Sequence, residues 1–133
     1  TDIQSALALS QLQRADQMLA RRKLLAERYH HALVNLPLKL PGTSEEIGHA
    51  YHLFVIRLAR RTALYDYLKT QQILCQIHYI PVHLHPYYQS LGFKKKQFPN
   101  AESFYETCMS IPLYPSMTDE QQAYVIEKIK SFF

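Results

Sequence analysis

Glycine is scarce in this chain: three glycines stand among 133 residues, at positions 42, 48 and 92. Loops that cradle phosphate groups use clustered glycines, because only they let the backbone approach the ligand closely. No such cluster occurs, and the Gly-x-Ser-x-Gly pattern of a hydrolase nucleophile is also missing. The sequence therefore argues against a self-contained nucleotide-binding enzyme and against a serine hydrolase.

Cysteine is equally scarce, and its spacing indicates no disulfide framework. Cys75 and Cys108 lie far apart and form no Cys-x-x-Cys pattern. We expect two buried, reduced thiols, as is typical of a cytoplasmic protein.

Long apolar runs are absent too, which excludes a membrane span and the hydrophobic region of a signal peptide. The chain opens at Thr1 without an initiator methionine, which predicts a fragment or a processed product. Its length fits one domain, residues 1–133.

The excess of positive charge is modest, with a formal net charge of +4. Basic residues fall in three separate clusters, at 21–23, 60–61 and 94–96. Nucleic-acid binding calls for a basic stripe within a recognisable module, and neither is present, so we expect no nucleic-acid partner.

Hydrophobic periodicity predicts alternating helices and strands. Strands are expected at 50–58, 73–80 and 109–113, and helices at 60–72, 101–107 and from Thr118 to the end. Residues 37–48 read as a polar connector. The predicted class is α+β: an open-faced sandwich with a small three-stranded sheet packed against helices.

A long helix is expected at the beginning. Thr1-x-x-Gln4 is a capping-box pattern, and apolar residues then recur at three-four spacing over about thirty residues, until Leu36-Pro37. A second apolar set, Leu9, Met18 and Leu25, indicates contact on another side. Either the local core is thick, or a domain or subunit that covers this side is missing.

Residues 78–88, His-Tyr-Ile-Pro-Val-His-Leu-His-Pro-Tyr-Tyr, form the most function-like stretch. Imidazole changes charge near neutral pH and suits proton transfer, polar ligands or metal. Pro81 and Pro86 are expected to hold the segment extended and outside any helix. His78, His83 and His85 supply three imidazoles, but no acid or cysteine lies within the segment. We therefore expect no metal site and interpret the stretch as a rigid binding loop.

Several motifs, in order, resemble the C-terminal part of the DegT/StrS family of pyridoxal-phosphate-dependent sugar aminotransferases. They are Thr1–Ala6 with Gln11-Leu12, Arg21-Arg22 with Tyr29, His49–Phe54, His78–His83 with Pro86–Tyr88, Phe98–Glu102, and Ser110–Pro115. The resemblance covers essentially all 133 residues.

This resemblance implies the small domain of a cytoplasmic, homodimeric aminotransferase. The parent enzyme would move an amino group from an amino acid, such as glutamate, to a nucleotide-linked keto-sugar, most similarly to members that aminate a UDP-linked 4-keto-6-deoxy-hexosamine. Products of such members feed surface polysaccharide or nonulosonic acid synthesis. The cofactor lysine would lie in a large N-terminal domain, so this chain alone should bind no cofactor and be inactive.

By the same resemblance, His78, Tyr79 and His83 are the candidate substrate-binding residues. They would contact the sugar nucleotide without acting as the base; the alternative is that the histidines only brace the loop. Two positions depart from the family pattern: Gln72 replaces a glycine, and Lys94–Gln97 lacks a glycine-acid pair. A rival interpretation is a freestanding binding or regulatory module of the same fold.

Overall fold

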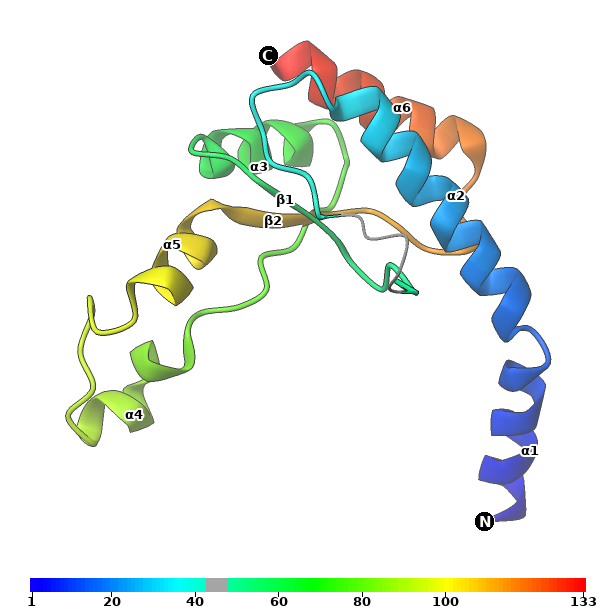
Figure 1. Cartoon of the computed structure of the whole chain (residues 1–133), viewed down its shortest axis with the longest axis horizontal. Coiled ribbons are helices and arrows are strands. Elements are labelled where there is room, and N and C mark those ends of the chain that lie inside the picture. Colours follow the sequence, from blue (N-terminus) through cyan, green and yellow to red (C-terminus); the bar gives the residue numbers. More distant parts are fainter. Residues whose placement is uncertain (43–47) are drawn as a thin grey trace.

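Figure 1 shows the computed structural model of the chain, which describes residues 1–42 and 48–133. Its elements are α1 (Asp2–Leu12), α2 (Ala15–Leu33), β1 (Phe54–Arg57), α3 (Arg61–Thr70), the 3-10 turn η1 (Val82–Leu84), α4 (Pro86–Ser90), α5 (Pro99–Thr107), β2 (Cys108–Ile111) and α6 (Asp119–Phe132). Helices around a small antiparallel sheet give the α+β arrangement that the sequence predicts. Part of the predicted polar connector, residues 43–47, lies outside the described residues.

Within the described residues the sheet has two strands, where the sequence predicts three. β1 and β2 pair antiparallel in a register that opposes Phe54 to Ile111. The expected strand at 73–80 makes a single bridge to β2, in which Gln76 and Ser110 exchange backbone hydrogen bonds of 3.1 and 2.7 Å. A third strand does not develop from this bridge, and the segment runs into Pro81, which has no N–H to donate to a ladder.

The expected single N-terminal helix is divided in two at Gln13–Arg14. The capping box of Thr1 and Gln4 forms as predicted and begins α1. No residue of α1 is buried, whereas α2 buries Leu25, Ala26, Tyr29 and Leu33. Only α2 packs against the body of the protein, so tertiary contacts hold one half of the predicted apolar stripe and leave the other half exposed.

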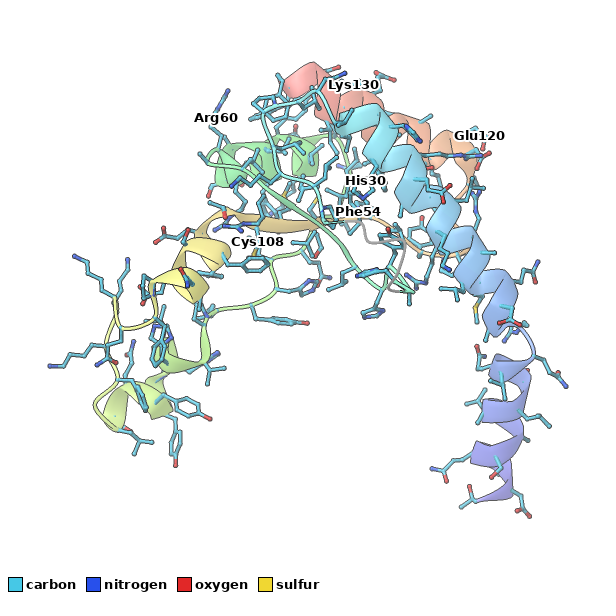
Figure 2. All side chains as sticks on the ribbon, viewed as in Figure 1. His30, Phe54, Arg60, Cys108, Glu120 and Lys130 are labelled. Atoms are coloured by element: carbon cyan, nitrogen blue, oxygen red, sulfur yellow. The ribbon has the colours of Figure 1, made fainter. Side chains whose placement is uncertain are left out.

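The core lies between the sheet and the three helices α2, α3 and α6. α6 packs against both α2 and α3, and α3 packs against β2. Phe54 points from β1 toward α2, where its ring centroid lies 5.1 Å from Tyr29 and 5.2 Å from His30 (Figure 2). A capping box of Thr118 and Gln121 begins α6, the helix predicted from Thr118, and α6 buries Val125 and Ile129 in this core.

α3 ends in a turn that usually requires glycine. Gln72 adopts a left-handed φ of 59°. Its N–H donates to Lys69, and the N–H of Ile73 donates to Leu68, which is the hydrogen-bond pattern of a Schellman motif. The turn is therefore the ordinary helix-ending turn, although Gln72, a residue with a β-carbon, replaces the glycine of the family pattern.

Two segments project from the core and leave a concave side between them (Figure 1). One is α1. The other comprises residues 79–98, which include η1 and α4; we call it the arm. Pro86 occupies the first turn of α4, where its missing N–H costs no hydrogen bond. The expectation that both prolines keep this segment extended is therefore wrong, because Pro86 begins a helix.

Candidate functional site

His78 is fixed where the segment that bridges to β2 at Gln76 leads into the arm. Its Nδ1 lies 3.0 Å from the hydroxyl of Ser110, and its Nε2 lies 3.1 Å from the amide oxygen of Gln76. An amide oxygen only accepts, so Nε2 carries a proton; in a neutral imidazole Nδ1 then accepts from Ser110. Hydrogen bonds on both ring nitrogens hold the imidazole in one orientation.

Strand alternation explains why these polar groups meet. Met109 and Ile111 point into the core, so the intervening Ser110 points to the opposite face of β2. Gln76 is paired with Ser110 across the bridge, which places their side chains on the same face, and His78 follows two residues later. The polar face is thus a direct consequence of the register at one bridge.

A shallow hollow of about 240 Å³ opens beside His78. Gln76, Ser110 and His52 contribute its polar lining, and Leu53, Leu74, Ile111 and Leu113 contribute most of its apolar lining. This mixture of apolar walls and a few oriented polar groups is typical of sites for small polar molecules.

Arg22 holds one wall of this hollow in place. Its guanidinium donates to the backbone carbonyls of Tyr51, His52 and Leu113 at 3.0, 3.2 and 3.3 Å. One planar side chain from α2 thereby ties the segment before β1 to the segment after β2. The hydrogen bond to its carbonyl helps to hold His52 in the lining of the hollow.

Tyr79 is the exposed neighbour of His78. Its side chain is 75% exposed, and its ring centroid lies 4.6 Å from that of His78. The His78–Tyr79 peptide bond is cis. The structure thus places two of the three predicted site residues together, one orienting its ring toward Ser110 and the other open to a ligand.

His83, the third predicted site residue, lies in a different environment. It is 7% exposed, and its Nε2 donates to a carboxylate oxygen of Glu102 at 2.9 Å. Its ring also packs on Phe98, with centroids 4.8 Å apart. A ligand would reach this imidazole nitrogen only by opening the pair with Glu102, so the geometry favours the bracing role for His83.

Glu102 is the centre of the hydrogen bonds that close the arm. Its carboxylate accepts from His83 and from the backbone amides of Lys96, at 2.7 Å, and Phe98, at 3.4 Å. Burial alone would raise the pKa of this carboxyl group, and the hydrogen bonds from His83 and the two amides outweigh that effect and lower the pKa. The ionised form therefore joins η1, the lysine-containing loop and α5.

Sequence reasoning missed both hydrogen-bond partners of the histidines. Ser110 reads as part of an apolar strand, and Glu102 reads as one acidic residue in the first turn of a helix. The only available signal for Glu102 was its position after Phe98-Pro99, where an acid suits the helix dipole. Neither signal identifies a histidine partner that is 32 or 19 residues away.

The geometry gives no support to a metal site in the described residues: in this part of the chain no three histidine, cysteine or acidic side chains gather closely enough to hold an ion. The Nε2 of His85 lies 3.3 Å from the carbonyl oxygen of Ile80.

Among the described residues, no helix combines the length and the apolar character that crossing a bilayer requires.

Comparison with known proteins agrees with this architecture. Residues 1–130 match the model of the DegT/DnrJ/EryC1/StrS aminotransferase family. The spore coat polysaccharide biosynthesis protein SpsC of Bacillus subtilis is 41% identical over an alignment that covers 97% of this chain and 36% of SpsC. The chain therefore spans little more than a third of the length of that relative.

Solved structures show the same fold. DesV of S. venezuelae superposes with a TM-score of 0.92 at 33% identity, covering 97% of this chain and 35% of DesV. Spr1654 of Streptococcus pneumoniae, assigned as a sugar aminotransferase and solved in a PLP form, superposes with a TM-score of 0.92 at 30% identity; the match covers 98% of this chain and 35% of Spr1654.

Proposed function

Because this chain belongs to the DegT/DnrJ/EryC1/StrS aminotransferase family, we propose that it is the C-terminal small domain of a pyridoxal-phosphate-dependent sugar aminotransferase. The observation that carries the proposal is the family match over residues 1–130. The parent enzyme would transfer an amino group from an amino acid, such as glutamate, to a nucleotide-linked keto-sugar for polysaccharide or amino-sugar synthesis.

The described residues do not by themselves fit the cofactor. A lysine that forms a Schiff base needs a site that lowers its pKa, such as burial, and every lysine of this chain is exposed or half-exposed. The chain also offers no glycine-rich phosphate cradle. We therefore place the cofactor and its lysine in the part of the parent enzyme that lies outside these residues.

His78 and Tyr79 are the residues that we assign to the substrate. The imidazole is held on the polar face by Ser110 and Gln76, and the Tyr79 ring stands exposed beside it. A sugar hydroxyl could hydrogen-bond to the phenol, while the two rings offer an apolar edge to the sugar face. In this role they bind and orient the sugar and transfer no proton.

His83 has a supporting part in this proposal. Its hydrogen bond to Glu102 fixes η1, which directly follows the segment that carries His78 and Tyr79. The parent enzyme is proposed to be a cytoplasmic homodimer, and the two free, buried cysteines suit a reducing compartment.

The test is steady-state kinetics of the full-length enzyme with a UDP-linked 4-keto-6-deoxy-hexosamine and glutamate. His78→Ala should raise the KM for the sugar nucleotide about tenfold and leave the KM for glutamate unchanged. His85→Ala, which alters an exposed histidine of the same segment, is the matched control and should leave both values unchanged. An unchanged sugar KM in His78→Ala would refute the binding role.

The rival interpretation, a freestanding binding module, makes a different prediction. The protein as its gene encodes it would then show no cofactor absorbance after addition of pyridoxal phosphate and no amino transfer. Observation of both in the full-length protein would exclude that module.

A further inference from the structure

The arm carries a second hollow, separate from the one beside His78. Its volume is about 400 Å³ and its lining is almost wholly apolar. The walls include Val82, His83, Tyr88, Phe93, Phe98 and Ala101. Neither His78 nor Tyr79 lines it, so the proposed function makes no use of this hollow.

Three aromatic rings shape the opening. The ring centroids of Tyr88 and Phe93 are 6.4 Å apart, and those of Phe93 and Phe98 are 6.2 Å apart. All three side chains remain more than one-third exposed: 37% for Tyr88, 39% for Phe93 and 47% for Phe98. An exposed group of rings around a concave apolar surface is a feature of sites that receive one side chain of a partner.

Positive charge is concentrated in the short loop between two of these rings, those of Phe93 and Phe98. This loop contains three consecutive lysines, Lys94, Lys95 and Lys96, and all three are exposed. Among the described residues, no carboxylate forms a salt bridge with any of these lysines. The nearby acid, Glu102, is buried and already accepts hydrogen bonds from His83 and two backbone amides.

The lysine-containing loop is held in shape while its side chains remain free. The amide of Lys94 donates to the side-chain oxygen of Gln97 at 2.9 Å, and the amide of Lys96 donates to both oxygens of Glu102. Fixing the backbone before binding reduces the entropy that a partner must offset.

We propose that the arm is a docking surface for an acidic peptide segment of a partner protein, which inserts one apolar side chain into the hollow formed by Tyr88, Phe93 and Phe98. The lysines then face the acidic residues that flank the inserted side chain. The lysines favour a partner of negative charge, and the concave apolar surface favours an apolar side chain as its anchor.

An anionic bilayer would also attract lysines beside exposed aromatic rings. A bilayer surface, however, presents no protruding side chain to fill a concavity, whereas a peptide does. The hollow therefore favours the peptide, and membrane binding becomes an outcome that the experiment must distinguish.

The experiment measures the fluorescence anisotropy of a short labelled peptide of alternating aspartate and glutamate with one central phenylalanine. The full-length protein should bind it, and a peptide with serine in place of phenylalanine should bind about tenfold more weakly. The double variant Lys94→Glu/Lys95→Glu should weaken binding at least about tenfold, because each reversal replaces attraction with repulsion. Lys96 is left unchanged because its amide donates to Glu102, and a new carboxylate next to that group would repel it.

The matched control reverses the same number of charges elsewhere. Lys23→Glu/Lys69→Glu alters exposed lysines of α2 and α3 and should leave the dissociation constant unchanged. Ala101→Trp, which places a large ring at the wall of the hollow, should abolish the preference for the phenylalanine peptide. Circular dichroism of each variant checks that the fold is retained.

Three results would overturn the proposal. One is equal affinity for the phenylalanine and serine peptides. Another is equal weakening by the arm and control double variants, which would show a non-specific charge effect. The third is the absence of peptide binding together with co-sedimentation on phosphatidylglycerol vesicles that depends on Lys94 and Lys95, which would assign the arm to a membrane surface.

Discussion

His83 and Glu102 form a buried pair in which the imidazole Nε2 lies 2.9 Å from a carboxylate oxygen, and neither side chain is more than 8% exposed. The pair connects η1 to α5, and the same carboxylate accepts from the amides of Lys96 and Phe98. The conformation of the arm thus depends on the hydrogen bonds that one acidic side chain, Glu102, accepts.

Removal of the charge of Glu102 should loosen the arm without unfolding the core. In Glu102→Gln the side-chain NH₂ group faces donors where a carboxylate oxygen accepted them, so these hydrogen bonds cannot all be kept. Hydrogen exchange at the amides of Lys96 and Phe98, followed by NMR, should accelerate about tenfold or more. Glu106→Gln, which changes an exposed acid of the same helix, should leave both rates as they are.

His83→Ala should act on the same network from the other side. It leaves the buried Glu102 with one donor fewer, and the melting temperature should fall by about 5 °C. A variant with the melting temperature of the wild type would show that the pair does not stabilise the arm.

Stability should depend on the ionisation of Asp119 in strong acid. Hydrogen bonds from Arg28 and then Arg21 lower the pKa of this carboxyl group from 3.8 to about 2. Because the folded state releases the proton more readily, the stabilisation is complete above pH 3.8 and is lost as the pH falls through about 2. Comparison of urea unfolding for the wild type and Asp119→Asn over this range should show a difference that shrinks toward low pH.

Salt provides the control for that comparison. Asp119 is exposed, so added salt should screen its attraction to the two arginines and reduce the difference at neutral pH as well. A difference that is constant with pH would contradict the assignment of the stabilisation to this carboxylate.

Gln72→Gly should stabilise the protein. The left-handed φ of 59° is unfavourable for a residue with a β-carbon, and glycine removes that strain while the Schellman hydrogen bonds remain. The free energy of unfolding should rise by about 0.5–1 kcal/mol in urea titration. Gln71→Gly, at the adjacent residue with φ −88°, should bring no gain; equal gains at both positions would refute the argument.

Cys75 should resist thiol reagents in the folded protein. Burial raises the pKa of its thiol to about 12, and Cys108 is buried as well, with its pKa also raised by burial. Iodoacetamide at pH 8 should therefore label neither cysteine until urea unfolds the chain, as mass spectrometry would detect. Rapid labelling of Cys75 under native conditions would contradict this burial.

Local signals in the sequence were sufficient for several elements. Thr118 and Gln121 satisfy free amides within one turn, so their capping box forms wherever α6 packs. The family resemblance could also be recognised from the sequence, because it depends on the order of motifs along the chain. The match over residues 1–130 confirms it.

Long-range contacts could not be predicted from the sequence, and these contacts determine the surroundings of His78 and His83. The apolar periodicity at 1–36 predicts one helix, but the chain forms two helices that meet at Gln13–Arg14, and core burial begins only at Leu25. Likewise, the β-rich composition of 73–80 predicts a strand, but the segment bridges to β2 only at Gln76.

The sequence alone determined that imidazole and phenol groups gather at residues 78–88, whatever the fold. Only the tertiary structure decided what each group does. The register of one bridge placed Ser110 against His78, and the packing of α5 placed Glu102 against His83. One histidine therefore lines a surface hollow and the other is buried against a carboxylate, because strand register and helix packing determine which distant residues become hydrogen-bond partners.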